Sequence, residues 1–358
     1  MKDNFLASKQ ASKQASKQAS RQQYAAVDIT RLIMAIFVIA IHTGPFTEYE
    51  DSPLMGLYKA VVNLAVPFFF VASGFFIQNK MMKNESCKGK QEVIIFDTLK
   101  KYCILYVKWS IVYLPIAVCF YLTDNMSIRA IIWDYIKGFF FVGEHYNSWA
   151  LWYLLASIYA YSFIMLAFRM RLKKPVYYCL IAFISMTAIL MTIVFRDGSG
   201  SLKIIAEPIN IANKMFVRGR IFTGIFYIPL GMLIKEFEQY IIKYKKWKSL
   251  LIMLIVIGIF ACSKTGFYGY VYEISRAIMV TALFMYTICN DLICEYSLVF
   301  RNVSQTVYFI HLWVWTALYT ILYREKTFGL VPFIGTVIVS LCIAFLYEKI
   351  KRRKLCIL

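Results

Sequence analysis

The chain has 358 residues, of which 60% are hydrophobic and only 17% are charged, and this composition excludes an ordinary water-soluble domain. Its formal net charge of +20 does not indicate a nucleic-acid partner, because the Lys and Arg residues are spread over tails and short connecting segments. We therefore predict an all-α, polytopic bundle of helices in the cell membrane, with the lipid bilayer as its main partner.

Apolar stretches long enough to cross about 30 Å of hydrocarbon recur along nearly the whole chain. The ten predicted spans are 29–46, 57–78, 102–122, 149–168, 176–195, 221–234, 249–263, 270–289, 304–323 and 328–347. The stretch 128–143 is also apolar but carries three charges, and we predict an interfacial or re-entrant segment there. An excess of Lys and Arg in alternate connections predicts that both termini are cytoplasmic.

The chain divides into a membrane domain and two tails. Residues 1–26 contain three copies of Ala-Ser-Lys-Gln and are predicted to be a disordered basic tail. Residues 27–348 form the predicted transmembrane domain, and 349–358 form a basic cytoplasmic tail. The segment 79–101 is predicted to be a cytoplasmic loop and 196–220 the largest external loop. No segment between spans is long enough for a soluble catalytic domain.

The first predicted span holds the most informative pair of residues. Arg31 and His42 are eleven positions apart, with no other charged residue between them. Eleven steps of about 100° come within about 20° of three full turns, so both side chains share one helix face, roughly 16 Å apart along the axis. Ionisable groups at membrane depth usually serve chemistry or transport. We predict a functional pair; the alternatives are snorkelling of Arg31 and an interfacial position for His42.

The later spans carry further polar side chains. Ser304, Tyr308 and His311 fall on one face of the ninth span, where His311 is either a cavity residue or a helix-packing donor. Glu273 and Arg276, three positions apart in the eighth span, suit an internal ion pair. The alternative for these two residues is a clamp for the amine and carboxylate of an amino acid.

The segments outside the spans offer weaker signals. His145 belongs to a polar external stretch and is predicted to be solvent exposed, and Arg218 and Arg220 are predicted to be interfacial charges. None of the nine cysteines forms a metal-type pair, so we predict no metal site and no bound cofactor.

Several hydrophobic motifs follow one another in a recognisable order. They are the Arg31-x10-His42 spacing, Phe-Phe-Phe-x-x-Ser-Gly-Phe-Phe at 68–76, Leu-Trp-Tyr-Leu at 151–154 and Tyr-Phe-Ile-His at 308–311. Together they resemble the acyltransferase-3 family of ten-helix membrane enzymes over residues 27–347. In this chain the Arg-rich motif that the family carries before the third span appears only as Lys100-Lys101, and Ala150 stands where relatives often have His.

The resemblance implies transfer of an acyl group from cytoplasmic acyl-CoA, a co-substrate, to a hydroxyl or amine acceptor. His42 would take a proton from the acceptor hydroxyl, and Arg31 would hold an anionic part of the donor or the developing oxyanion. Lys100 and Lys101 would attract coenzyme A phosphates. The expected substrate cavity is lined by Trp152, Tyr153, Glu273, Arg276, Tyr308 and His311.

A narrower likeness leads to an alternative function. The runs His42-Thr-Gly-Pro, Ala65-Val-Pro-Phe-Phe-Phe and Tyr227-Ile-Pro-Leu-Gly resemble the membrane half of vancomycin-resistance serine racemases. Those proteins join such a bundle to a cytoplasmic racemase domain that uses pyridoxal phosphate. This likeness implies a membrane subunit that takes up L-serine for a separate racemase, or a truncated piece of a fused protein.

Overall fold

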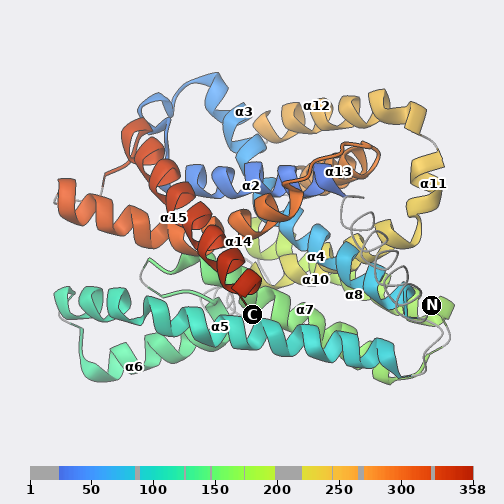
Figure 1. Cartoon of the computed structure of the whole chain (residues 1–358), viewed down its shortest axis with the longest axis horizontal. Coiled ribbons are helices and arrows are strands. Elements are labelled where there is room, and N and C mark those ends of the chain that lie inside the picture. The colour runs from blue at the N-terminus through green and yellow to red at the C-terminus, as the bar shows by residue number, and fades with distance from the viewer. Residues whose placement is uncertain are drawn as a thin grey trace.

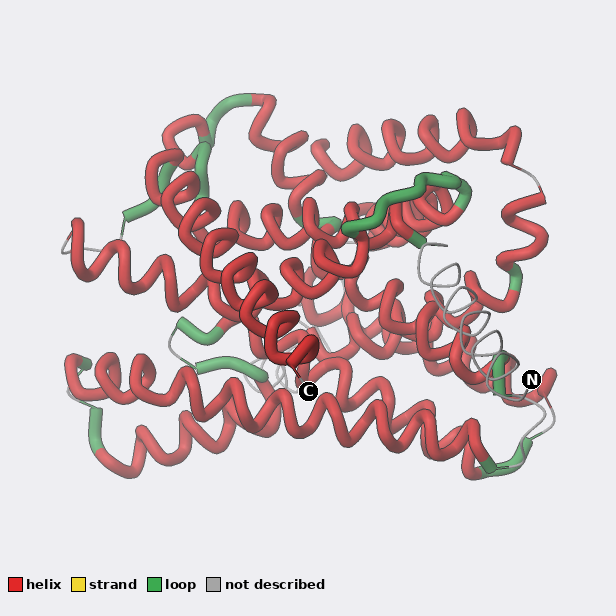
Figure 2. The backbone as a smooth tube through the Cα atoms, in the orientation of Figure 1, coloured by secondary structure: helices red, strands yellow, loops and turns green. Residues whose placement is uncertain are grey.

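The computed structural model describes residues 24–84, 89–124, 126–145, 147–172, 174–197, 220–243, 245–264, 270–323 and 327–357. These residues form helices joined by short turns and contain no strand (Figure 2). Most of the predicted disordered tail (residues 1–23) and most of the predicted external loop 196–220 lie outside the described residues. The last residues of the predicted tail, Ala25 and Ala26, are instead the first residues of α2.

The helices are arranged as a bundle in which segments distant in sequence lie side by side (Figure 1). They are α2 (Ala25–Thr43), α3 (Pro53–Val62), α4 (Ala65–Met82), α5 (Lys90–Thr123), α6 (Ile128–Lys137), α7 (Trp152–Arg169), α8 (Lys174–Asp197), α10 (Arg220–Glu236), α11 (Glu238–Lys243), α12 (Lys248–Lys264), α13 (Tyr270–Ile288), α14 (Ser297–Leu318) and α15 (Leu330–Ile357).

Among the described residues, six helical segments are long and apolar enough to cross a membrane, with α3 and α4 taken together as one of them. Helix α8 adds a shorter apolar stretch at Val176–Met191. Helices suit this composition because in hydrocarbon every backbone N–H and C=O must be paired within its own segment. The predicted all-α, multi-pass membrane fold is confirmed. The number of ten crossings and the cytoplasmic side of both termini stay predictions.

Two elements differ from the sequence prediction. The second predicted span is interrupted by a turn at Asn63 and Leu64, which divides it into α3 and α4. The predicted loop 79–101 is helical from Lys90 onwards, where the 34-residue helix α5 begins. Ile95 is fully buried on the early part of α5, so this charged stretch has an apolar side that packs against the bundle.

Helix α4 lies at the centre of the bundle and packs closely against α10. A Cβ atom added at Gly74 would lie 1.8 Å from the carbonyl oxygen of Ile228, and one added at Gly231 would lie 2.0 Å from that of Val71. The two backbones therefore touch at two points where only glycine fits. Such close approach of two helix backbones is what small residues at a helix interface permit.

A polar cluster joins the beginning of α2 to the end of α10. The hydroxyl of Tyr24 donates to Glu238 Oε1 at 2.8 Å, and Lys235 forms an ion pair with the same carboxylate. Helix α14 packs against α2 and α15 on another side of the bundle. These contacts fix α2, α4, α10 and α14 relative to one another and so position the polar residues described below.

Candidate functional site

A cavity of about 530 Å³ lies among α2, α4, α5, α7 and α14, at the end of the bundle where α2 begins. We call it the cationic cavity. Its lining residues are Arg31, Phe69, Ser73, Phe76, Ile77, Asn79, Lys80, Thr98, Lys101, Tyr102, Leu105, Tyr153, Leu154, Tyr161, Arg301, Asn302, Ser304, Gln305, Tyr308 and Phe309.

Four of the described lining residues are cationic, namely Arg31, Lys80, Lys101 and Arg301, and none carries a carboxylate. Arg31 has one acidic partner behind the lining, because its Nη1 lies 3.6 Å from Asp28 Oδ1. The guanidinium also lies over the ring of Phe76, 4.7 Å from the ring centroid. The excess of positive charge among the described lining residues makes this cavity suited to an anionic ligand such as a phosphate ester.

Deeper lining residues bring three hydroxyl groups together. Ser73 Oγ lies 3.0 Å from the hydroxyl of Tyr102 and 2.9 Å from that of Tyr153, and the two tyrosine hydroxyls are 3.4 Å apart. These groups come from α4, α5 and α7, so the packing of three helices creates the cluster. It offers donors and acceptors to a polar part of a ligand inside an otherwise apolar wall.

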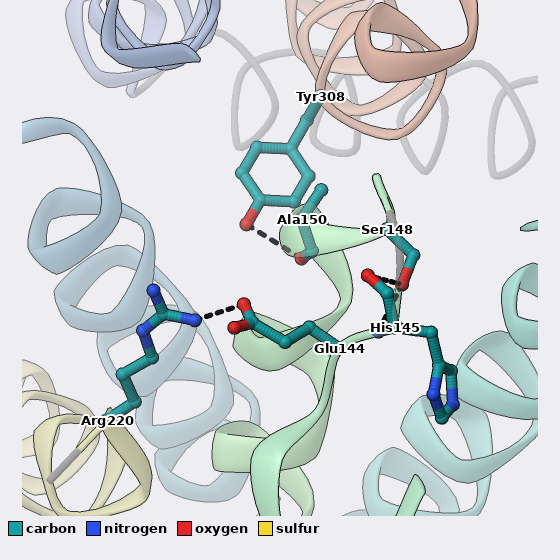
Figure 3. A network of polar contacts seen from close by, with 6 residues as sticks. All are labelled: Glu144, His145, Ser148, Ala150, Arg220 and Tyr308. Carbon is teal, nitrogen blue, oxygen red and sulfur yellow. Dashed lines mark hydrogen bonds and ion pairs between the residues drawn. The ribbon is translucent and has the colours of Figure 1, made fainter. Parts of the chain in front are cut away.

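Tyr308 stands between the cationic cavity and a pair of histidines. Its hydroxyl donates to the carbonyl oxygen of Ala150 at 3.1 Å (Figure 3). Its ring centroid lies 6.2 Å from that of His311, and the His311 ring lies 5.3 Å from the ring of His42. His42 also stacks on Trp149, with 5.5 Å between centroids and 20° between planes. Two imidazoles from α2 and α14 therefore meet behind Tyr308.

The orientation of the His311 ring follows from its backbone contact. Nδ1 lies 2.7 Å from the carbonyl oxygen of Tyr308, so this nitrogen carries the proton and donates. Nε2 is then the acceptor, and it is buried with no hydrogen-bond partner among the described residues. The side chain is fully buried. Such a nitrogen is available to a proton or to a donor group of a ligand.

The predicted site residues fall into three groups. Arg31, Lys101, Tyr153 and Tyr308 line the cationic cavity. His42 and His311 lie together behind Tyr308, a contact between α2 and α14 that was not predicted from the sequence. Trp152, Lys100, Glu273 and Arg276 are not among the lining residues. The catalytic and binding roles of all of these residues stay predictions.

Glu273 and Arg276 form the ion pair that their spacing predicts. Arg276 Nη2 donates to Glu273 Oε2, and both side chains are buried. The guanidinium lies 5.4 Å from the ring centroid of Tyr272 and 6.0 Å from that of Tyr227. The internal ion pair is confirmed, whereas the amino-acid clamp stays a prediction.

Several lining residues were not predicted as site residues. The sequence did contain a signal for Arg301, because it lies seven positions before Tyr308 and thus on the same face of α14. No sequence pattern identified Ser73 and Tyr102 as site residues, because their contact depends on how α4 and α5 pack. Lys80 looked like one of many basic residues in a connecting segment.

The connection 143–148 between α6 and α7, described except for residue 146, contains buried polar groups (Figure 3). Glu144 forms an ion pair with Arg220 at the start of α10. Burial raises the pKa of Glu144, and Arg220 opposes that rise. The prediction that Arg220 is an interfacial charge is therefore incomplete, because it has a specific partner in this connection. Arg218 lies outside the described residues.

The prediction that His145 is solvent exposed is wrong. The side chain is only 7% exposed, and its ring stacks on that of Tyr135 with centroids 4.1 Å apart and planes 2° apart. The backbone of Gly138 lies against the imidazole, and a Cβ there would approach Nδ1 to 2.5 Å. The polar sequence of this connection predicted exposure, but the connection folds inward against α6.

We expect the protein to lose stability as the pH falls from about 6.5 to 4, because of His145. Burial lowers the pKa of His145 to about 4, and Asp134 only partly offsets the effect. In the unfolded chain the pKa of this histidine is about 6.5, so between about pH 6.5 and 4 only the unfolded state takes up the proton. This uptake lowers the free energy of unfolding by up to about 3 kcal/mol. Thermal unfolding in detergent between about pH 7.5 and 4.5 measures the loss.

The matched variant for this prediction is His145→Phe, which keeps the stacking on Tyr135 but does not titrate. Its thermal midpoint should fall less over the same pH range than that of the wild type. Equal pH dependence in the two proteins would show that His145 is not the responsible group.

Comparison with known proteins adds independent information. The family model for acyltransferase-3, described as an acyltransferase domain, matches residues 24–349. This match covers the cationic cavity and the pair His42 and His311. No solved structure matches the chain significantly.

Three curated relatives carry racemase names. Two proteins of Enterococcus faecalis named amino-acid racemase are 28% identical over 213 residues and 32% identical over 132 residues, which is 58% and 37% of this chain. A serine/alanine racemase of Enterococcus gallinarum is 30% identical over 91 residues, 25% of this chain. The matched stretches span only 27%, 18% and 13% of the respective relatives, so the chain covers a minor part of each of them.

Proposed function

The chain belongs to the acyltransferase-3 family, and from that premise we propose that it transfers an acyl group from cytoplasmic acyl-CoA to a hydroxyl or amine acceptor. The observation that carries the proposal is the cationic cavity. Arg31, Lys101 and Arg301 meet there with no carboxylate in the described lining, as binding of the phosphates of coenzyme A requires.

The separation between the cations and the histidines supports an elongated donor. Arg31 lies in the cavity, whereas His42 lies eleven residues further along α2, roughly 16 Å away along the axis. A thioester held at the far end of a long arm would pass the hydroxyl cluster of Ser73, Tyr102 and Tyr153 and approach Tyr308. Phosphates would then stay at the cations while the thioester reaches the histidines.

The chemistry requires one base and one stabilised oxyanion. The acceptor oxygen attacks the thioester carbonyl, His42 takes the hydroxyl proton, and the C–O bond forms as the C–S bond breaks. The proton then passes to the thiolate, which leaves as free coenzyme A. In this arrangement Arg31 serves to hold the anionic part of the donor, since the distance to His42 makes it a poor partner for the oxyanion.

A second function is supported by the racemase names of the relatives. We propose as the alternative that the chain is the membrane subunit of a vancomycin-resistance serine racemase system and takes up L-serine for a separate racemase. The relatives' names support an amino-acid substrate, and the buried Glu273–Arg276 pair supplies groups of both signs. The positively charged cationic cavity favours acyl transfer over this alternative.

Proteoliposomes containing the full chain distinguish the two functions. We expect release of coenzyme A from acetyl-CoA in the presence of hydroxyl acceptors, and we expect Arg301→Gln to raise the KM for acetyl-CoA about tenfold, because one charge-assisted contact is lost. Arg169→Gln is the matched control, since Arg169 pairs with Glu92 outside the cavity. Accumulation of L-[14C]serine without any release of coenzyme A would reject acyl transfer and support the alternative.

A further inference from the structure

Helices α4, α5 and α7, which line the cationic cavity, also contribute to a second cavity of about 280 Å³. The second cavity lies where α4 and α10 end and where α5 and α8 begin. It is lined by Gln78, Met81, Met82, Gln91, Phe168, Arg171, Leu172, Tyr177, Tyr178 and Glu236. The two cavities share none of their lining residues, so the second one is distinct from the proposed donor site.

One wall of the second cavity carries a fixed carboxylate. Gln78 Nε2 donates to Glu236 Oε2 at 2.8 Å and also lies 3.3 Å from the hydroxyl of Tyr178. Gln78 itself is buried, so these contacts hold the carboxylate in place. No cationic side chain in the described part of the chain pairs with Glu236. The carboxylate is therefore available to a positively charged group of a ligand.

Two more groups in the same cavity lack partners within the described ranges. Arg171, in the turn after α7, is solvent exposed and forms no ion pair with a described residue. The Tyr177 hydroxyl is buried and makes no hydrogen bond with any described residue. The Tyr177 ring is fixed by its neighbours, with centroids 6.1 Å from Phe168 and 5.5 Å from Tyr178. A buried hydroxyl without a partner is uncommon in proteins and is the type of group that a ligand satisfies.

We propose that this second cavity binds a small zwitterionic amino acid. The ammonium group would bind Glu236 and the tyrosine hydroxyls, and the carboxylate would bind Arg171 through its forked donors. Met81, Met82 and Phe168 would contact a short side chain. The assignment follows from one charge of each sign that faces a single small cavity and has no ionic partner among the described residues, since a ligand that carries both charges neutralises both.

Isothermal titration calorimetry on the full chain in detergent tests the proposal with L-alanine as the probe. Ethylamine lacks the carboxylate of alanine and propionate lacks its amine, so both should bind at least tenfold more weakly. L-Tryptophan should not bind, because its side chain exceeds the space. If ethylamine binds as tightly as alanine, carboxylate recognition by Arg171 is wrong.

Variants locate the binding site. We expect Glu236→Gln, which keeps the hydrogen bond from Gln78, and Arg171→Gln, on an exposed side chain, each to weaken L-alanine binding at least tenfold. The Glu92→Gln and Arg301→Gln proteins should bind L-alanine as tightly as the wild type. Glu92 pairs with Arg169, and Arg301 lines the cationic cavity. No binding by the wild type, or unchanged binding by both cavity variants, would overturn the proposal. Arg301→Gln is expected to weaken acetyl-CoA binding but not L-alanine binding. The two proposals can therefore fail independently of each other.

Discussion

Replacing His42 by alanine is expected to lower the rate of acyl transfer by a factor of about 10² to 10⁴, the usual contribution of a general base. His42 is the half-exposed member of the histidine pair, and it is fixed between Trp149 and His311. The neighbouring imidazole of His311 is fully buried, so His42 is the member of the pair that an acceptor hydroxyl can reach. Release of coenzyme A from acetyl-CoA by proteoliposomes, at saturating donor, measures the effect.

The chain contains three histidines, and His145, which lies outside the histidine pair, serves as a comparison. His145→Phe removes an imidazole from the connection 143–148 and should keep the wild-type rate at neutral pH. Arg31→Gln should mainly raise the KM for the donor, whereas His42→Ala should lower kcat and leave that KM nearly unchanged. A His42→Ala protein with wild-type kcat would show that the base lies elsewhere.

The parts of the site that depend on a single helix could be predicted from the sequence. The buried Glu273–Arg276 pair follows from three-residue spacing, and the common face of Tyr308 and His311 follows from helical periodicity. The membrane fold itself follows from composition, because an apolar segment in lipid must satisfy its backbone polar groups internally. Each of these features needs only local geometry.

The parts that depend on contacts between helices could not be predicted. The meeting of His42 and His311 requires the relative depth of α2 and α14, which no local pattern contains. The hydroxyl cluster of Tyr102 and Tyr153 likewise requires α5 to lie beside α7. The burial of His145 was missed for a related reason, since polar residues in a connection suggest exposure until the fold turns that connection inward.

The contact between α4 and α10 leads to the second large expected effect. Replacing Gly231 by alanine should lower stability by about 3 kcal/mol or more, above the usual range for an overpacked site because the obstacle is backbone. The new Cβ would lie 2.0 Å from the carbonyl oxygen of Val71, and the equivalent atom at Gly74 would lie 1.8 Å from that of Ile228. Neither carbonyl can rotate away, so the two helices would have to separate. Thermal unfolding of the detergent-solubilised protein measures the loss.

Gly335→Ala on α15 is the matched control, because its Cβ would meet only the Leu318 side chain at 3.5 Å, an ordinary contact distance. There the alanine should be neutral or should stabilise by up to about 1 kcal/mol through its higher helix propensity. Separation of α4 from α10 would also move Ser73 on one face of α4 and Gln78 on another. Gly231→Ala should therefore weaken both acetyl-CoA turnover and L-alanine binding, whereas Gly335→Ala should change neither. Equal thermal midpoints for the two variants would mean that the backbones are not in contact at Gly231.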